Sequence, residues 1–344
     1  MKLRFVRALG LFSMELGIYS FGDSGTVPTR QRLADLVAQA RYADEAGLDV
    51  IALGEHHRPD FTLSAPEIVL AAISSVTDRI RLSTGVTVLS TADPVRVYQQ
   101  FATLDQLSGG RAEIIAGRGA FTESFPLFGY DLRSYDLLFE EKLKLLLQIA
   151  AESPVTWQGR TRPPLENAEV TPRALQEPLP IWVGVGGTPQ SAVRAGRLGA
   201  PMFVAIFTDP APARGLVELY HRAAAGAGHD PATLRVASGG HMFVGRTSQG
   251  ARDAFYPYYS EYLSLLPQFS GGMPREVYDQ WIRAGLLVGS PQEVIDKIMR
   301  HRELLGISRY VGQFDVGGMP SGMIDKSLEL FATEVAPVIR KETS

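Results

Sequence analysis

The chain has 344 residues, no cysteine and a formal net charge of −3, with 45% hydrophobic and 21% charged residues. Without cysteine it can form neither disulfides nor thiolate metal sites, and its weak negative charge gives no support for nucleic acid as a partner. The hydrophobic content is sufficient for a sizeable core. No apolar stretch approaches the length of a transmembrane helix, so we expect a cytoplasmic protein that does not enter a membrane.

Residues 1–13 are expected to be an N-terminal extension in front of one domain that spans 14–344. Three basic residues, Lys2, Arg4 and Arg7, precede a short apolar stretch at 8–12, without the long apolar segment and small-residue cleavage site of a signal peptide. Met14 is a candidate start residue, because the residues after it already have the pattern of a first strand.

The domain alternates between apolar runs typical of buried strands and apolar residues at helical spacing. Strands are expected at 17–21, 50–53, 79–89, 112–116, 181–185, 202–207, 235–244 and 310–314. Helices are expected at 33–43, 66–73, 94–107, 134–151, 189–198 and 322–335. Strands separated by helices pair in parallel through right-handed crossovers. Eight such strands favour an α/β fold of the (β/α)8 TIM barrel type over a doubly wound open sheet.

Two segments interrupt this rhythm and are interpreted as insertions. The Pro- and Gly-rich segment near 153–180 predicts a small hairpin. The segment near 255–287 is rich in aromatic residues and contains a Gly-Gly break at 271–272. Long insertions often form lids or binding loops, whereas packing against the barrel or a partner subunit explains the aromatic residues equally well. The sequence leaves both interpretations open.

The strand at 50–53 is followed by three polar residues, Glu55, His56 and His57. Active sites of α/β barrels lie at the carboxyl ends of the strands, and imidazole suits proton transfer near neutral pH. Successive strand residues point to opposite faces, so at most one of the two histidines faces the site while the strand continues. Adjacent residues cannot converge on one ion as a helical i, i+4 pair does, so we expect no metal site. His241, near a later strand, is given no role.

Five groups of motifs occur in a recognisable order and together span nearly all of 14–340. They are Ala46-Gly-Leu-Asp-Val-Ile-Ala-Leu-Gly-Glu-His-His57; Arg79-Ile-Arg-Leu-Ser-Thr-Gly-Val-Thr-Val-Leu89 with Asp93-Pro-Val-Arg96; Leu104-Asp-Gln-Leu-Ser-Gly-Gly-Arg111 with Ala116-Gly-Arg-Gly119; Pro180-Ile-Trp-Val-Gly-Val-Gly-Gly-Thr-Pro189; and Val288-Gly-Ser-Pro-Gln-Glu-Val294. With this ordered set the chain resembles the bacterial luciferase-like family of flavin-dependent monooxygenases and oxidoreductases. The resemblance implies a (β/α)8 barrel that binds FMN as cofactor, is usually a homodimer, and often receives reduced flavin from a separate flavin reductase.

A candidate site for the phosphate of FMN lies at 184–189. This segment leads from a strand into a helix, where exposed backbone N–H groups and the positive helix end favour an anion. The candidate cofactor-binding residues are Gly186, Gly187, Thr188 and Ser191, the last two as hydroxyl donors. From the residues alone, a turn with a helix cap is the competing interpretation, and the resemblance favours the phosphate site.

Arg118 and Gly119, at the end of the fourth expected strand, are further cofactor-binding candidates. Small neighbours allow a ligand to approach the backbone, and a guanidinium can donate to a phosphate or to reduced flavin. An exposed ion pair is the alternative for Arg118. By resemblance, Gly85 and Val86 stand where the family often has a non-proline cis peptide bond beneath the flavin ring; from the residues alone, Gly85 equally fits a bulge.

The resemblance places His56 at an active-site histidine position. We expect His56 to be the catalytic residue, assisting breakdown of a flavin peroxide or deprotonating a substrate adduct, with Glu55 among the cofactor-binding residues and His57 shaping the pocket. The predicted function is that of an FMN-dependent monooxygenase, which uses reduced flavin and O2 to oxidise a small apolar or carbonyl-containing substrate. Hydride transfer with a deazaflavin, and a non-catalytic flavin-binding protein, are the alternatives.

Overall fold

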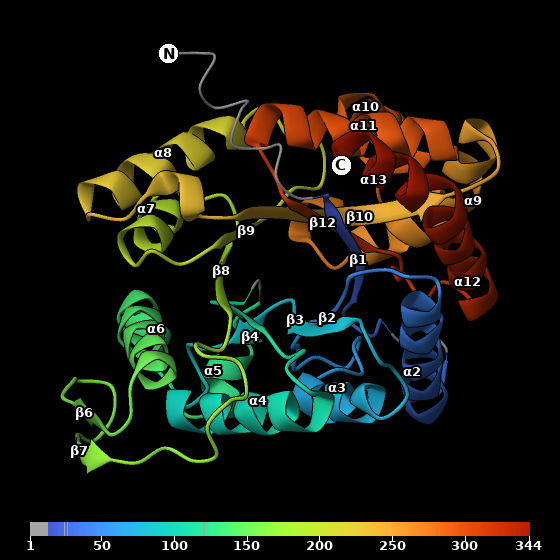
Figure 1. The fold of residues 1–344 in the computed structure, drawn as a ribbon. Coiled ribbons are helices and arrows are strands. Elements are labelled where there is room, and N and C mark those ends of the chain that lie inside the picture. The colour runs from blue at the N-terminus through green and yellow to red at the C-terminus, as the bar shows by residue number, and fades with distance from the viewer. Residues whose placement is uncertain (1–12, 24, 26, 120) are drawn as a thin grey trace.

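The computed structural model describes residues 13–23, 25, 27–119 and 121–344. Except for Ser13, the expected N-terminal extension lies outside these residues. Strands gather at the centre of the molecule and helices surround them (Figure 1). Among the described residues, no helix has the length and apolar character needed to cross a membrane.

Eight parallel strand segments build the barrel in the described part of the chain. They are β1 (Glu15–Ser20), β2 (Val50–Leu53), β3 (Arg81–Thr84) continued by β4 (Thr87–Val88), β5 (Ile114–Gly117), β8 (Ile181–Val185), β9 (Met202–Ala205), β10 (Val236–Val244) and β12 (Arg309–Gln313). Neighbours pair in the order β3-β2-β1-β12-β10-β9-β8-β5-β4. A parallel bridge between Leu82 and Ala112 joins the two ends of this path. The predicted (β/α)8 barrel is therefore confirmed.

The helices lie outside the strands. They are α2 (Thr29–Glu45), α3 (Pro66–Ser74), α4 (Pro94–Ser108), α5 (Ser124–Leu127), α6 (Tyr135–Ala151), α7 (Pro189–Arg197), α8 (Ala213–Gly226), α9 (Ser248–Leu263), α10 (Arg275–Ala284), α11 (Pro291–Leu305), α12 (Ser321–Leu330) and α13 (Ala336–Thr343). Proline is the first residue of α3, α4, α7 and α11, where its fixed φ suits a helix start and no N–H partner is needed. Asp93 caps α4 by accepting hydrogen bonds from the backbone N–H groups of Val95 and Arg96.

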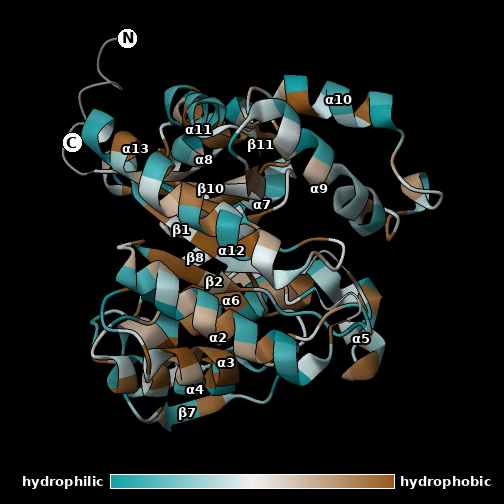
Figure 2. Ribbon diagram, turned by 90° about the vertical axis from the view of Figure 1, so that its right-hand side faces the viewer, coloured by the Kyte–Doolittle hydropathy of each residue, from teal (hydrophilic) through white to brown (hydrophobic). Residues whose placement is uncertain are grey.

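Side chains of the strands alternate between two cores. One set fills the barrel interior: Tyr19, Val50, Ala52, Ile115, Trp182, Phe203, Ala237 and Val311. Neighbouring strand residues such as Ile18 and Ile51 point outward and pack under the helices, as the two-residue period of a strand requires. In Figure 2, β1, β2 and β8 in the middle of the molecule are largely hydrophobic, whereas hydrophilic stretches lie on the surrounding helices.

Several expected boundaries need correction. The single strand expected at 79–89 is two strands, β3 and β4, which are separated by Gly85 and Val86. The expected strand at 202–207 ends at Ala205. No helices were expected at α8, α9, α10 or α11, although Val294, Ile295, Ile298 and Leu305 of α11 have helical spacing.

Both segments interpreted as insertions have regular structure. The hairpin predicted near 153–180 is present, with β6 (Val155–Trp157) antiparallel to β7 (Leu165–Ala168). The aromatic segment near 255–287 contains the end of α9, all of α10 and the start of β11 (Leu287–Gly289), which adds to β10. Tyr259 and Tyr278 of this segment are buried, so much of its aromatic character serves packing against the barrel.

Candidate active site

His56 follows β2 at the carboxyl end of the barrel and is surrounded by aromatic rings. It stacks on Phe61, with ring centroids 4.4 Å apart, and meets Phe21 edge-on at 4.4 Å and Phe121 at 5.5 Å. The side chain is nearly enclosed, and this burial, with smaller contributions from the charges of His57 and Arg58, lowers the pKa of His56 to about 3. His56 is therefore neutral at neutral pH, with one nitrogen able to accept a proton.

Glu55 holds the exits of two strands together. Its Oε2 accepts a hydrogen bond from the backbone N–H of Val88 in β4 at 2.7 Å, and its Oε1 accepts one from His57 Nε2 at 2.9 Å. His57 is thereby turned toward Glu55, while His56 faces the rings of Phe21 and Phe61. The two histidines thus have different surroundings. Strand alternation does not explain this, because β2 ends at Leu53, before both histidines.

The peptide bond between Gly85 and Val86 is cis. The side chain of Val86 rests above two glycines at the ends of β5 and β8. A Cβ atom on Gly117 would lie 2.4 Å from Val86 Cγ2, and one on Gly184 would lie 2.9 Å from Val86 Cγ1. Val86 also packs on the inner core of the barrel. Gly85 and Val86 therefore form part of the floor at the carboxyl end, in contact with three strands.

Arg118, which follows β5, reaches the beginning of α7. Its Nη2 donates to Ser191 Oγ at 3.0 Å and to Thr188 Oγ1 at 3.3 Å. The two hydroxyl oxygens are 2.7 Å apart. These three polar side chains, predicted separately from two distant motifs, are thus brought together by the structure.

The turn before α7 leaves space for a ligand. Gly186 and Gly187 are exposed, and a Cβ atom at either position would meet no other atom within 4 Å. Gly187 has a φ of 109°, a conformation that favours glycine. Thr188 occupies the N-cap position, but its side chain makes no capping hydrogen bond. We refer to the cofactor-binding residues predicted around this turn as the phosphate cradle: Arg118, Gly186, Gly187, Thr188 and Ser191.

Gly119 connects the cradle with the Glu55 side of the site. A Cβ atom on Gly119 would lie 3.3 Å from Val88 Cγ1, and the same Val88 donates its backbone N–H to Glu55. Leu89 also donates its backbone N–H to the Gly117 carbonyl at 3.0 Å. The exits of β2, β4, β5 and β8 therefore meet in one region, which contains all ten residues predicted for the site.

Two charged residues at the cradle, Asp136 and Arg194, were not predicted from the sequence. Asp136 in α6 accepts from Arg118 Nη1 at 2.9 Å, and Arg194 in α7 lies 3.5 Å from the same Asp136 oxygen. Arg194 follows Ser191 by three residues, and helix geometry places residues with this spacing on one face. That spacing was visible in the sequence, whereas the approach of α6 was not.

His241 was given no role, yet it also lies at the carboxyl end of the barrel. It pairs with Gln313 in the β10–β12 register, stacks on Phe207 at 4.4 Å and hydrogen-bonds Tyr259 through Nδ1 at 3.0 Å. Its Nε2 is buried without a hydrogen-bond partner. Burial lowers the pKa of His241 to about 3, so this ring is also neutral.

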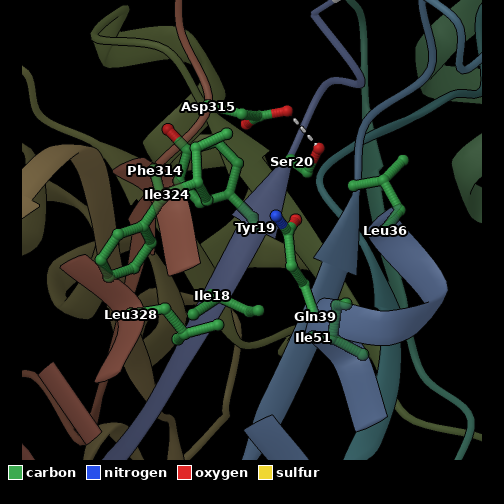
Figure 3. Close-up of a pocket in the computed structure, with 10 residues that line it drawn as sticks. All are labelled: Ile18, Tyr19, Ser20, Leu36, Gln39, Ile51, Phe314, Asp315, Ile324 and Leu328. Carbon is green, nitrogen blue, oxygen red and sulfur yellow. Dashed lines mark hydrogen bonds between the residues drawn. The ribbon is translucent and has the colours of Figure 1, made fainter. Parts of the chain in front are cut away.

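A small cavity lies elsewhere, between the strands and the helices α2 and α12. Figure 3 shows its lining, in which apolar side chains such as Ile18 and Leu328 lie at one end and the Ser20–Asp315 hydrogen bond lies at the other. At about 20 Å³ the cavity is far smaller than a ligand pocket for a flavin. It is a gap in helix–sheet packing, separate from the region around His56 and Arg118.

The fold and these residues define a class: a (β/α)8 barrel with candidate catalytic and anion-binding groups at the carboxyl ends of its strands. A family model described as luciferase-like monooxygenase matches residues 14–309. The chain therefore belongs to the luciferase-like monooxygenase family and is a flavin-dependent oxidoreductase.

Known relatives and solved structures resemble nearly the whole chain. The alkanal monooxygenase alpha chain of Photorhabdus luminescens is 27% identical over 335 residues, covering 89% of this chain and 91% of the relative. The crystal structure of the monooxygenase RslO1 from Streptomyces bottropensis has a TM-score of 0.84 and 26% identity, covering 94% of this chain and 99% of its own.

Two other structures share the fold but differ in cofactor. The oxygenating constituent of 3,6-diketocamphane monooxygenase from Pseudomonas putida, in complex with FMN, has a TM-score of 0.78 at 21% identity and covers 95% of this chain and 99% of its own. An F420-dependent secondary alcohol dehydrogenase has a TM-score of 0.76 at 21% identity, with the same coverage. Proteins with this fold therefore use more than one flavin-type cofactor.

Proposed function

We propose that this protein is an FMN-dependent monooxygenase, which uses reduced flavin and O2 to oxidise a small apolar or carbonyl-containing molecule. The observation that carries the proposal is the pair of hydrogen bonds from Arg118 to Thr188 and Ser191 at the start of α7. A guanidinium, two hydroxyl groups and a helix N-terminus together match the needs of a phosphate group. The open space beside Gly186 and Gly187 gives such a group room.

The rest of the site suits a flat ring next to the phosphate. Val86 supplies an apolar surface at the carboxyl end of the barrel, and Gly117 and Gly184 permit its position. FMN, when bound, supplies the redox chemistry, and the protein orients reactants and excludes water. The rings of Phe21, Phe61 and Phe121 around His56 are suited to excluding water.

His56 is proposed as the catalytic residue because it offers a neutral imidazole in these apolar surroundings. Its low pKa keeps His56 unprotonated before the reaction. The same burial makes it a weak base in the free protein, because an efficient general base has a pKa near the operating pH. The pKa of His56 in the protein without substrate also lies far below neutral pH. We therefore expect no change in kcat/KM between pH 6 and 8 that arises from His56 in the free enzyme.

Hydride transfer with a deazaflavin cofactor is the second candidate, and the similarity in fold to an F420-dependent dehydrogenase favours testing it. A non-catalytic flavin-binding protein is the third. For the first proposal, O2 is the co-substrate and reduced FMN arrives from a separate flavin reductase. We further propose a homodimer, as the family resemblance implies.

The test measures binding and turnover separately. Photoreduced FMN is titrated anaerobically into the protein, and O2-dependent conversion of a panel of aldehydes and ketones is then followed with reduced FMN. We expect saturable FMN binding, and conversion that is abolished in His56→Ala while FMN affinity stays within about twofold. The control is His229→Ala. His229 lies near the surface, where its Nε2 hydrogen-bonds the backbone carbonyl oxygen of Arg197.

Three outcomes would redirect the proposal. Absence of saturable FMN binding in the wild-type protein rejects it. Binding without O2-dependent conversion of any substrate in the panel, and without hydride exchange, favours the non-catalytic protein. Anaerobic hydride exchange with a deazaflavin, in the absence of conversion with FMN, favours the second candidate.

A further inference from the structure

We infer that Asp136 is an internal competitor for the phosphate cradle: its carboxylate holds Arg118 and Arg194 in the protein without ligand, and a cofactor phosphate displaces it and binds both arginines. The inference rests on the proposed function, because it concerns how the same cradle takes up a phosphate-bearing flavin. The inference extends the phosphate cradle by a second cation, Arg194, and by a negatively charged residue, Asp136, that opposes phosphate binding.

The first step of the argument is that one carboxylate oxygen serves two arginines. Asp136 Oδ1 lies 2.9 Å from Arg118 Nη1 and 3.5 Å from Arg194 Nη2. The other nitrogen of the Arg118 fork, Nη2, already donates to Thr188 and Ser191. Asp136 thus binds the same Arg118 guanidinium as the two cradle hydroxyl groups. A phosphate at the cradle would use that guanidinium too.

The second step is that Arg194 remains incompletely satisfied. Its side chain is 12% exposed, and its guanidinium carbon lies 5.5 Å above the ring of Phe139. Its Nη1 is buried and has no hydrogen-bond partner. Glu140, the other acid that influences this region, is hydrogen-bonded to Lys144 instead. A buried unpaired donor is costly, so Arg194 favours an acceptor that brings more oxygen atoms than Asp136 presents.

The third step compares the two anions. Asp136 is 72% exposed, so its ion pairs contribute little and it can return to water at small cost. A phosphate monoester carries up to two negative charges and three strong acceptor oxygens, enough for Arg118, Arg194 and the two hydroxyl groups. Charge-assisted bonds to such a group are stronger than neutral ones. Phosphate is therefore expected to win the exchange, while Asp136 repels it and lowers its affinity.

This arrangement has a consequence for a cofactor that is exchanged rather than kept. Asp136 can take back the arginines when the phosphate leaves, so the cradle does not remain with two uncompensated cations. A weaker hold on FMN suits an enzyme that receives reduced flavin from a separate source. The effect is specific to the phosphate, because a flavin without phosphate does not compete for Arg118 and Arg194.

The experiment compares FMN with riboflavin, which lacks the phosphate. Dissociation constants of both reduced flavins are measured anaerobically for the wild-type protein, Asp136→Asn, Arg194→Met and the double variant. We expect Asp136→Asn to bind FMN about tenfold more tightly, equivalent to about 1.4 kcal/mol, and riboflavin without change. Arg194→Met should weaken FMN binding at least tenfold. The gain from Asp136→Asn should shrink in the double variant, because one of its two arginine partners is gone.

Two controls complete the design. Glu45→Gln removes one charge from an exposed ion pair with Arg41 on α2, and should leave both affinities unchanged. Inorganic phosphate should compete with FMN, and should do so at lower concentration in Asp136→Asn. Circular dichroism and thermal unfolding verify that each variant is folded.

The outcomes separate the inference from the proposed function. If wild-type protein binds FMN but Asp136→Asn binds it no more tightly, the competitor role is rejected and the proposed function stands. Equal tightening for riboflavin would also reject it, because the effect would not involve the phosphate. If the wild-type protein binds neither FMN nor phosphate, the proposed function and this inference are both rejected.

Discussion

At the residue scale, the position of Val86 depends on the absence of side chains beneath it. Gly117 and Gly184, at the ends of two neighbouring strands, leave the space that its methyl groups fill. Where a side chain approaches a glycine this closely, even one added methyl group is poorly tolerated, since cores are densely packed. The same glycines therefore control the floor of the proposed flavin site.

We predict that Gly117→Ala weakens FMN binding about tenfold, because the new Cβ would begin 2.4 Å from Val86 Cγ2 and must displace Val86. The measurement is an anaerobic titration with reduced FMN, accompanied by thermal unfolding. Gly215→Ala is a matched control, since a Cβ there meets no atom within 4 Å and the residue lies in α8; it should bind FMN normally. Unchanged FMN affinity in Gly117→Ala would contradict the assignment of Val86 to the site.

At the element scale, a buried ion network ties three strands together at the amino end of the barrel. Arg309 in β12 forms a two-pronged pair with Glu113, just before β5, and donates through Nε to Glu15 of β1 at 2.7 Å. The Arg309 and Glu113 side chains are almost completely buried. The guanidinium also lies 4.7 Å above the ring of Trp182 in the inner core. This network closes the end of the barrel opposite the candidate active site.

Removal of Arg309 should therefore destabilise the fold more than it disturbs the site. We predict that Arg309→Met lowers the free energy of unfolding by about 3–5 kcal/mol, because Glu113 is left buried without its partner. The double variant Arg309→Met with Glu113→Leu should recover part of this loss, since it removes the unpaired charge. Urea unfolding curves measure both effects. A loss below about 1 kcal/mol for the single variant would show that Glu113 is not buried as an ion.

At the scale of the whole molecule, buried histidines make stability depend on pH. Burial lowers the pKa of His56 and His241 to about 3 and that of His301 to about 4, from an ordinary value of 6.5. The unfolded chain takes up protons at these residues below pH 6.5, whereas the folded protein does not until pH 4 to 3. Each such residue therefore favours unfolding as the pH falls through this window, by about 1.4 kcal/mol per pH unit.

Asp23 acts in the opposite direction. Burial, and secondly the charge of Asp315, raise its pKa from 3.8 to about 6. Because the folded protein binds this proton more tightly than the unfolded chain, Asp23 stabilises the fold fully below pH 3.8. This stabilisation is lost as the pH rises through 6. One carboxyl group opposes three histidines, so unfolding near pH 5 takes up about two protons net from these groups.

We therefore predict that stability declines as the pH is lowered from 6.5 toward 4.5. Urea unfolding at a series of pH values gives the slope. His301→Gln, on the outer face of the barrel where His301 bonds Ser238, should reduce this slope by about 1.4 kcal/mol per pH unit, whatever its effect on absolute stability. Stability that stays constant over this range would mean that the histidines are accessible to protons in the folded state.

Much of the fold was predictable because it depends on short-range patterns. Apolar runs such as 50–53 and 181–185 became strands with those same ends, and Pro66, Pro94 and Pro189 begin helices as residues of the first turn. The strand–helix alternation then allows few topologies, because parallel strands need crossovers of one hand. The strand expected at 79–89 is interrupted at Gly85 and Val86, and the apolar pattern of this segment does not reveal that interruption.

The sequence by itself also determined at which end of the barrel the candidate site residues lie, since residues at the carboxyl ends of parallel strands share one edge of a barrel. Their partners were decided only by the tertiary structure. The contact of Arg118 with Ser191 spans 73 positions, and the shared use of Asp136 by Arg118 and Arg194 depends on how α6 and α7 approach each other. The neutral state of His56 likewise follows from rings contributed by separate loops. Local propensity acts over a few residues, whereas burial and charge pairing depend on distances in space that only the packed barrel sets.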